Sequence, residues 1–364
     1  MGLIYQKKFC IVWHFDRSAC YQVRYGNWMH LLNTGAGGEC ELVGTTEPIY
    51  DGLVLARTAS IVIPRFAGDR AIDIRRLASF KKRYNFEIVL DYDDLLWSMG
   101  NIEPIPEYNP YRLNTHHVNA AIRDILPYVD RITFSTVLLA QLFRQEFASH
   151  DKPAPQLPAL EVLPNFGFTS LAWDEKRPKR KKPLLMYTGS AAHYSADHPG
   201  DFAGPWVKGL ELVADKFDIV GFGTERGPLP SSTRLIEHVP ASLWLPTLSR
   251  LAPDIIIAPL KCNMFNACKS PIKAIESALV GAAFVGSAMP RGPYNPYLDP
   301  NYMVLEGDTP QHAADVLMAL ADPGIRQANA EFTAAQVINN GLIAESKPAI
   351  DHFLKCTYGK YVNL

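Results

Sequence analysis

Short apolar runs alternate with amphipathic segments through the first half of the chain. The runs are rich in β-branched and aromatic residues, as buried strands are, and they lie at 9–13, 61–63, 86–90 and 131–136. Residues 69–84 place Ile74, Leu77 and Phe80 at helical intervals, with basic residues between them. Further helices are predicted at 118–126 and 137–147. Strands that alternate with helices indicate a parallel sheet with crossover helices.

The second half repeats this pattern. Strands are predicted at 184–187, 217–220, 254–258 and 282–285, and helices at 206–215, 241–251, 272–280, 309–320 and 325–339. We therefore predict an α/β protein with two Rossmann-like, doubly wound domains, at 1–170 and 180–340, facing a central cleft. Residues 345–364 are predicted to form a helix and tail that pack back on the N-terminal domain. Ligands of such folds bind at the carboxyl ends of the strands.

Composition narrows the class of protein. The formal net charge is −1, so overall charge gives no argument for nucleic-acid binding. Six scattered cysteines without a C-x-x-C pair form neither a cysteine metal knuckle nor a tight disulfide scaffold, which favours a reducing cytosol. The longest apolar stretch, 278–289, has about twelve residues, whereas a membrane span needs roughly twenty. No signal peptide is apparent. We expect a soluble cytoplasmic protein.

A charged segment separates the two predicted domains. Residues 174–182 read Asp-Glu-Lys-Arg-Pro-Lys-Arg-Lys-Lys, a sequence that cannot contribute to an apolar core. We interpret it as a surface linker at the domain boundary. The alternative is a contact with the phosphate backbone of a nucleic acid.

The segment 266–276 carries the clearest chemical signal. It predicts a loop with Lys269 and Ser270, followed by a helix with Lys273 and Glu276. A helix start presents unpaired N–H groups and the positive end of the dipole, so it binds anions. A carboxylate one turn further in can accept hydrogen bonds from sugar hydroxyls. The pattern predicts a nucleotide-diphosphate site, and the alternative is a surface salt bridge.

Two small-residue turns follow strands of the second domain. Thr188 to His193 contains Gly189 and Ser190, and Gly223 closes the second turn. Glycine lets backbone N–H groups approach a phosphate closely, so both turns are candidate donor-binding elements, with His193 beside them. Neither turn has the three-glycine spacing of a dinucleotide fingerprint.

Three carboxylates, Asp91, Asp93 and Asp94, cluster at the end of a predicted strand in the first domain. Like charges this close raise at least one pKa, which suits an acid or a base. Three interpretations remain open: a helix N-cap, a metal-binding Asp-x-Asp, and a catalytic or acceptor-orienting carboxylate. His14 follows the first strand, and Arg24 lies on the helix predicted after it, so both are candidates for the acceptor side.

Taken together, these segments resemble glycosyltransferases of the GT-B fold, in the retaining group that uses nucleotide-diphosphate sugars. The similar segments are Val89 to Trp97, Phe134 to Thr136, Val162 to Asn165, Tyr187 to Ser190 and Lys269 to Ser287. The family has two glutamates separated by seven residues, then Gly and Ser. Glu276, Gly281 and Ser287 match this pattern, whereas Cys268 stands at the first glutamate position.

The resemblance implies roles for the candidate residues. Gly189 and Ser190 would contact the diphosphate, and Lys269, Ser270 and Lys273 would neutralise it, so that no metal is required. Glu276 would bind the ribose of a UDP-sugar. Asp93 or Asp94 would orient or deprotonate the acceptor hydroxyl. The Asp-Tyr-Asp sequence is also similar to the metal motif of the GT-A fold, which we rank lower because GT-A enzymes lack a second nucleotide-binding domain.

Three functions follow from the resemblance. Related phage enzymes glycosylate hydroxymethylated pyrimidines in double-stranded DNA. The basic linker and the basic residues from Arg75 to Arg83 fit that acceptor, and Trp97 would stack on a flipped base. A surface glycan or a protein is the second acceptor class. The third possibility is a non-catalytic sugar-nucleotide-binding protein, which the missing first glutamate favours.

Overall fold

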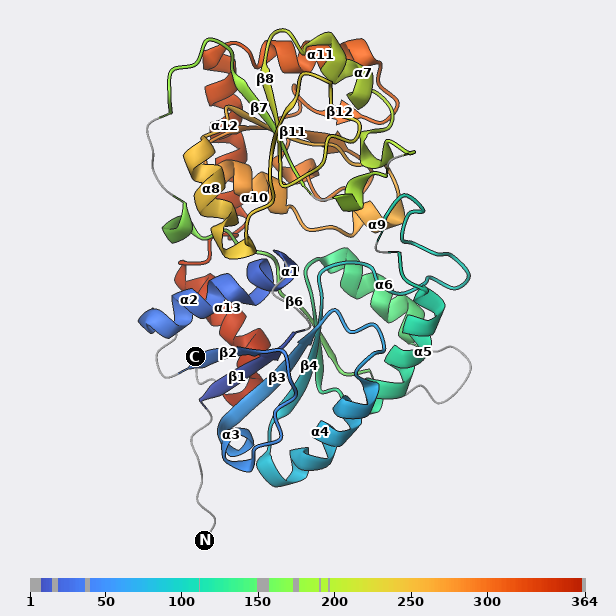
Figure 1. The fold of residues 1–364 in the computed structure, drawn as a ribbon. Helices are drawn as coiled ribbons and strands as arrows, with labels where there is room; N and C mark the ends of the chain where they lie inside the picture. Colours follow the sequence, from blue (N-terminus) through green and yellow to red (C-terminus); the bar gives the residue numbers. More distant parts are fainter. Residues whose placement is uncertain are drawn as a thin grey trace. The chain divides into compact units, whose positions relative to one another are not determined.

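The computed structural model describes residues 8–14, 19–36, 40–110, 112–148, 157–172, 177–189, 191–195 and 197–361. The chain forms two structural units. The first unit comprises residues 1–104, 113–165 and 344–364, and the second comprises 105–112 and 166–343. The C-terminal helix therefore belongs to the first unit, and a short segment from the N-terminal half belongs to the second (Figure 1).

Within the described residues, the first unit holds a parallel six-stranded sheet in the order β2-β1-β3-β4-β5-β6. Its strands are β1 (Phe9–Trp13), β2 (Glu41–Thr45), β3 (Thr58–Pro64), β4 (Glu87–Tyr92), β5 (Arg131–Phe134) and β6 (Ala159–Val162). All seven residues of β3 are buried, as expected of a central parallel strand covered on both faces. Four of these strands were predicted from the sequence, whereas β2 and β6 were not.

Several helices of the first unit begin at a side-chain cap, whereas α2 (Asn27–Leu31) and α4 (Ala71–Tyr84) have none. Asp51 accepts from the first backbone N–H groups of α3, Thr136 caps α6, and Ser346 caps α13. The C-terminal α13 packs against the segment that follows β1, where Phe353 stacks on Trp28 with ring centroids 4.2 Å apart. The helices are α1 (Ala19–Tyr21), α2 (Asn27–Leu31), α3 (Gly52–Arg57), α4 (Ala71–Tyr84), α5 (Thr115–Ile125), α6 (Val137–Phe147) and α13 (Lys347–Tyr358).

The second unit also has a parallel sheet, with six strands among its described residues in the order β12-β11-β10-β7-β8-β9. Successive residues of β7 enter opposite apolar cores: Leu185 and Tyr187 face one core, and Leu184 and Met186 the other. The sheet is therefore buried on both faces. Its strands are β7 (Leu184–Thr188), β8 (Asp218–Phe222), β9 (Arg234–Ile236), β10 (Ile255–Ala258), β11 (Ala283–Ala288) and β12 (Val304–Leu305).

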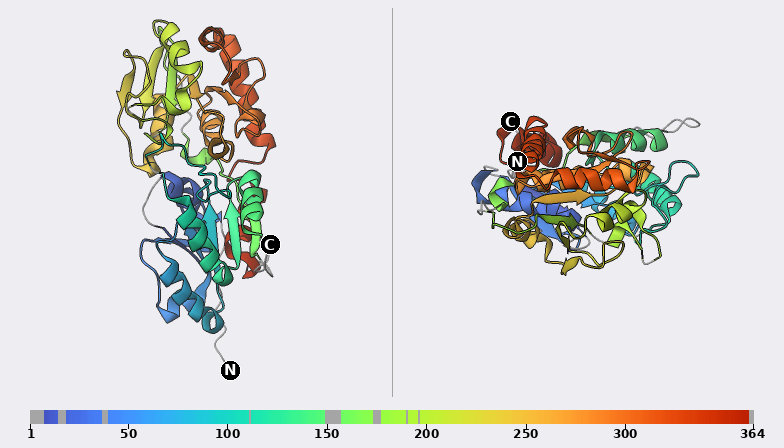
Figure 2. Two further views of the ribbon diagram at one scale, coloured as in Figure 1. Left: turned by 90° about the vertical axis from the view of Figure 1, so that its right-hand side faces the viewer. Right: turned by 90° about the horizontal axis from the view of Figure 1, so that it is seen from above.

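Helices cover both faces of this second sheet (Figure 2). Trp206 of α7 and Leu317 of α11 lie in one core, and Leu248 of α8, Ile275 of α10 and Val337 of α12 lie in the other. This doubly wound arrangement is the one predicted. The helices are α7 (Trp206–Leu212), α8 (Trp244–Leu251), α9 (Met264–Ala267), α10 (Ile272–Leu279), α11 (Pro310–Ala319) and α12 (Pro323–Asn339).

Two arginines of the predicted basic linker have structural contacts. Arg177 donates to the carbonyls of Val280 and Gly281, just after α10. Arg180 donates to the carbonyls of Leu251 and Ala252 at the end of α8. A cation at a helix C-terminus satisfies free carbonyls and complements the dipole. Among the described helices, none combines the length and apolar character needed to cross a bilayer.

Candidate functional site

Two lysines and a glutamate lie at the start of α10, and Lys273 forms with Glu276 the salt bridge that the sequence left open as an alternative. Lys273 Nζ lies 2.9 Å from Glu276 Oε2, and the Lys269 and Lys273 side chains are each only 15% exposed. Glu276 is 6% exposed, although charged residues are rarely buried without a reason. The N-cap residue of α10, Pro271, gives no side-chain hydrogen bond to the first N–H groups of the helix. Ser270 is also buried here.

Trp244 completes the environment of Glu276, and the sequence analysis did not identify it. Its indole N–H donates to Glu276 Oε1 at 2.9 Å, so both carboxylate oxygens have a partner. The Lys273 ammonium lies 5.1 Å from the indole ring centre, within cation–π range. Trp244 is 32 residues from Glu276, so only the fold brings them together.

Gly223 fits its position for two reasons. Its φ of 68° lies in the left-handed region, and a Cβ there would clash with the Trp244 ring. The preceding Phe222 stacks on the same indole at 4.2 Å. Gly223, predicted as a phosphate-binding glycine, therefore leaves the space that the Trp244 ring occupies. Whether it also contacts a donor stays a prediction.

His193, in the segment after β7, is paired with Asp201, an aspartate just before α7 that the sequence analysis did not identify. His193 Nδ1 lies 2.7 Å from Asp201 Oδ2, and Lys269 Nζ lies 3.4 Å from His193 Nδ1 and 3.8 Å from Asp201 Oδ2. Gly189 belongs to the same segment after β7, and Ser190 lies outside the described residues. The neighbouring hydroxyls of Tyr187 and Thr188 are buried and lack a hydrogen-bond partner among the described residues.

Asp201 is the most heavily bonded carboxylate of the group, at 1% exposure. Besides His193, it accepts from the Tyr108 hydroxyl at 2.6 Å, from Asn266 Nδ2 at 2.6 Å and from the backbone N–H of Lys261 at 3.2 Å. Burial alone would raise its pKa, but Lys269 and the hydrogen bonds from His193 and Tyr108 outweigh burial and lower the pKa of Asp201 to about 2.

Tyr108 reaches Asp201 from the 105–112 segment of the second unit. Its ring also stacks on His198 with centroids 5.3 Å apart. The Tyr108–Asp201 contact joins residues 93 positions apart, and nothing in the local sequence marks either one. Sequence patterns could not have found this pair, because its partners lie on different elements.

In the first unit, Asp91 has a structural position. It is buried at the end of β4 and forms a bidentate salt bridge with Arg24. Arg24 also donates to the carbonyl of Leu163 and to Asn165, and Thr133 donates to Asp91 at 2.6 Å. The predicted catalytic role of Asp91 and acceptor role of Arg24 do not fit this geometry, because the two charges neutralise each other inside the unit.

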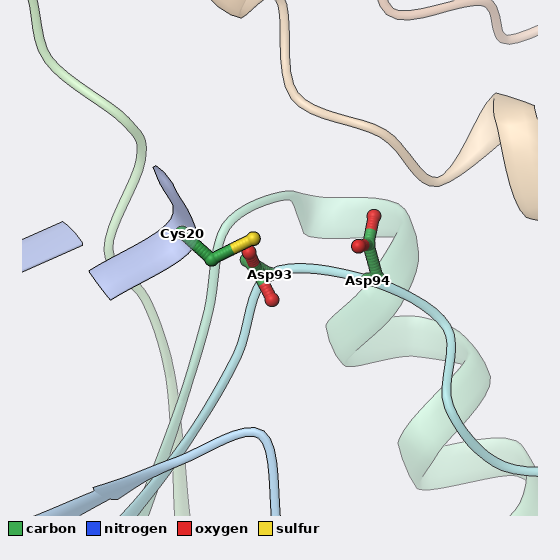
Figure 3. A group of neighbouring side chains, drawn as sticks. All are labelled: Cys20, Asp93 and Asp94. Carbon is green, nitrogen blue, oxygen red and sulfur yellow. The ribbon is translucent and has the colours of Figure 1, made fainter. Parts of the chain in front are cut away.

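Asp93 and Asp94 lie on the loop after β4, with Cys20 of α1 beside them (Figure 3). Their ligand atoms lie within 4.8 Å of one another, as in a metal site. However, Arg65 Nη1 lies 2.7 Å from Asp93, 2.8 Å from Asp94 and 3.3 Å from the Cys20 sulfur. The guanidinium occupies the place of a cation, and burial raises the pKa of Cys20, which keeps the thiol protonated. The residues fit a salt bridge better than a metal.

Two other predicted acceptor residues are buried. Trp97 is fully enclosed by aromatic rings, including Tyr92 at 5.4 Å and Phe143 at 5.3 Å. It has no free face on which a base could stack, so its predicted role is replaced by a core role. His14 is also buried and stacks on Tyr21 at 3.9 Å. Both residues follow predicted strands in the sequence, but burial and ring stacking make them part of the core.

The sequence was compared with protein-family models and with curated proteins, and neither comparison gave a match. Solved structures do match. Anabaena Alr3699/HepE in complex with UDP and glucose aligns with a TM-score of 0.58 and 11% identity, covering 96% of this chain and 99% of that one. A glycosyltransferase from Rickettsia africae ESF-5 aligns with a TM-score of 0.54 and 11% identity, covering 98% and 99%.

A third match is an E. coli structure described as trehalose-6-phosphate bound with UDP-2-fluoro glucose. Its TM-score is 0.53 and its identity is 13%, with 95% of this chain and 86% of that chain covered. At such identities the similarity shows the fold alone. With the two parallel sheets, it confirms the predicted GT-B fold of two Rossmann-like domains.

Proposed function

We propose that this protein is a glycosyltransferase that moves a sugar from a UDP-sugar to an acceptor hydroxyl. The observation that carries the proposal is the pair of largely buried lysines beside a buried glutamate at the start of α10. Lys269, Lys273 and the first N–H groups of α10 would bind the diphosphate. Glu276 would exchange one of its present partners for ribose hydroxyls.

The surroundings support this assignment. Anabaena HepE, which shares the fold, binds UDP-glucose and UDP with glucose. The donor group would also include Ser270 and the turn with Gly189, Ser190 and His193, since His193 adjoins Lys269. Retention of the anomeric configuration and independence of metal belong to the same proposal. Both rest on the family resemblance, and the donor sugar, hexose or pentose, is left open.

Thermal unfolding in the presence of a panel of nucleotide sugars tests donor binding. A ligand at about a hundredfold excess over its Kd adds roughly 2.7 kcal/mol to the unfolding free energy, so the correct donor raises Tm by several degrees. Turnover is then measured as release of nucleoside diphosphate. We expect Lys273→Ala and Glu276→Ala to abolish turnover while keeping the fold, with a lowered Tm because each removes one partner of a largely buried pair. Lys208→Ala, an exposed cation on α7, is the matched control. Normal turnover in both site variants would refute the site.

On the acceptor side, Asp93 and Asp94 are the remaining candidates for orienting a hydroxyl, since their side chains are 10% and 23% exposed. The charge argument for DNA is weaker in the structure. On α4, Arg75 pairs with Asp124 and Lys81 with Asp130, and Arg177 and Arg180 contact helix ends. The acceptor is therefore either a hydroxymethylated base in phage DNA or a glycan or protein. A steep decrease of DNA affinity with salt would favour DNA.

One observation favours a non-catalytic alternative. Cys268, at the position where the family has its first glutamate, is fully buried and offers no carboxylate. A protein that only binds sugar nucleotides would show the thermal shift without releasing nucleoside diphosphate. The two readouts together therefore separate the enzyme from the binding protein.

A further inference from the structure

His193 occupies an unusual position for a neutral side chain. It lies between a carboxylate and an ammonium group, in the turn after β7. Because Asp201 is ionised at all ordinary pH values, Nδ1 carries the hydrogen that bonds it. The other ring nitrogen, Nε2, then has a lone pair, and the side chain keeps 21% exposure.

Four charged or titratable side chains face this imidazole from the surrounding segments. They are Asp201 before α7, Lys269 before α10, Lys273 on α10 and Tyr187 on β7, whose ring centroid is 6.4 Å away. Burial and the Lys269 ammonium lower the pKa of His193 below its usual range, although Asp201 acts in the opposite direction. The free protein therefore holds His193 neutral at pH 7.

The charges of the group cancel before a ligand arrives. Lys269 and Lys273 are balanced by Asp201 and Glu276, which leaves the start of α10 as the remaining positive feature. The diphosphate of a UDP-sugar adds two negative charges beside Lys269, and that of free UDP adds about three once its terminal phosphate has lost its second proton. Those charges offset the ammonium that disfavours imidazolium, and they favour the protonated ring directly.

We propose that His193 takes up a proton when a nucleoside diphosphate binds, and that its Nε2–H then donates to a phosphate oxygen while Nδ1–H stays on Asp201. The inference rests on the proposed function and adds a third cation to the two lysines. Asp201 acts as a positioning residue: it fixes the ring and stabilises the imidazolium. Donor binding thereby becomes linked to pH.

Proton uptake is measurable by isothermal titration calorimetry of UDP binding in buffers of different ionisation enthalpy. We expect the wild-type protein at about pH 7.5, above the usual pKa of histidine, to take up as much as about one proton per UDP. His193→Asn cannot be protonated, although its amide can still donate to Asp201. It should bind UDP more weakly and without this uptake. His312→Asn, which alters a second His–Asp pair of the same unit with a 3.5 Å contact, should behave like wild type.

A second measurement does not depend on the variant folding. The terminal phosphate of UDP titrates at about pH 6, so above about pH 7.5 its charge is constant. Affinity of the wild-type protein for UDP should then decrease as pH rises, by up to about tenfold per unit. UDP binding with a pH-independent affinity and no proton uptake overturns the role of His193 and leaves the proposed function standing. Equal uptake in His193→Asn also overturns it. Failure of UDP and every other nucleoside diphosphate to bind overturns both proposals.

Discussion

The two units each hold a cluster of charged side chains at the carboxyl ends of parallel strands, and the clusters differ in how tightly they are paired. In the first unit, the Arg24 guanidinium and the Asp91 carboxylate are 2% and 1% exposed, and both are bonded on several sides. In the second, Lys269 lies 3.8 Å from Asp201, beyond hydrogen-bond distance. Lys273 is itself hydrogen-bonded to Glu276 at 2.9 Å, so the contrast rests on Lys269. Tight pairing indicates a structural pair, whereas the loosely held Lys269 ammonium retains capacity for an anion.

The largest expected effect is on the tight pair. Arg24→Ala leaves the Asp91 carboxylate buried without its partner, and breaking such a pair costs about 3–5 kcal/mol. Chemical denaturation of the full-length protein should show this loss in its unfolding free energy. Arg65→Ala removes a partner of Asp93 and Asp94 whose side chain is 33% exposed, and it should cost less than about 1 kcal/mol. Equal losses in the two variants would remove the distinction between buried and partly exposed pairs.

An intermediate effect concerns acid stability of the second unit. The pKa of Asp201 is lowered to about 2 in the folded protein, so the unfolded chain binds its proton more readily. This depressed pKa contributes stability that is fully present above about pH 4 and is lost as pH falls towards 2, by about 2 kcal/mol. Between about pH 4 and pH 2, the unfolding free energy of the wild-type protein should fall more steeply with decreasing pH than that of Asp201→Asn. Parallel curves would contradict the assignment.

The smallest expected effect isolates one hydroxyl. Tyr108→Phe removes the hydrogen bond to Asp201 but keeps the stacked ring, so we expect a loss of about 1 kcal/mol and a UDP affinity lowered a few-fold. Tyr50→Phe removes a comparable bond to Asp73 in the first unit and should leave UDP affinity unchanged. If both variants bind UDP like wild type, Tyr108 has no part in arranging the cation cluster.

The sequence was sufficient for features that depend on local spacing. Apolar runs located eight of the twelve described strands, and the doubly wound fold followed from their alternation with helices. The missed strands β2, β6, β9 and β12 lie at the sheet edges, where burial is incomplete and the apolar signal is weaker. Lys273 and Glu276 could be paired from the sequence because they lie one helical turn apart.

Partners supplied by distant segments could not be predicted. Arg65, Asp201, Tyr108 and Trp244 each meet their partner through the fold, across 28 residues or more in the pairs Arg65–Asp93, Trp244–Glu276 and Tyr108–Asp201. Without Arg65, the aspartates after β4 look like an unbalanced acidic cluster, whereas the structure shows a neutralised one. A run of like charges in a sequence says little until its counter-charges are known.

The placement of residues 105–112 affects any attempt to divide this protein. The polypeptide passes between the units at four points, near residues 104, 112, 165 and 343, so a single cut cannot yield two complete halves. A fragment that starts at residue 166 would lack Tyr108 and leave one oxygen of Asp201 short of a donor. Independent expression of the second unit would need this octapeptide grafted on or supplied in trans.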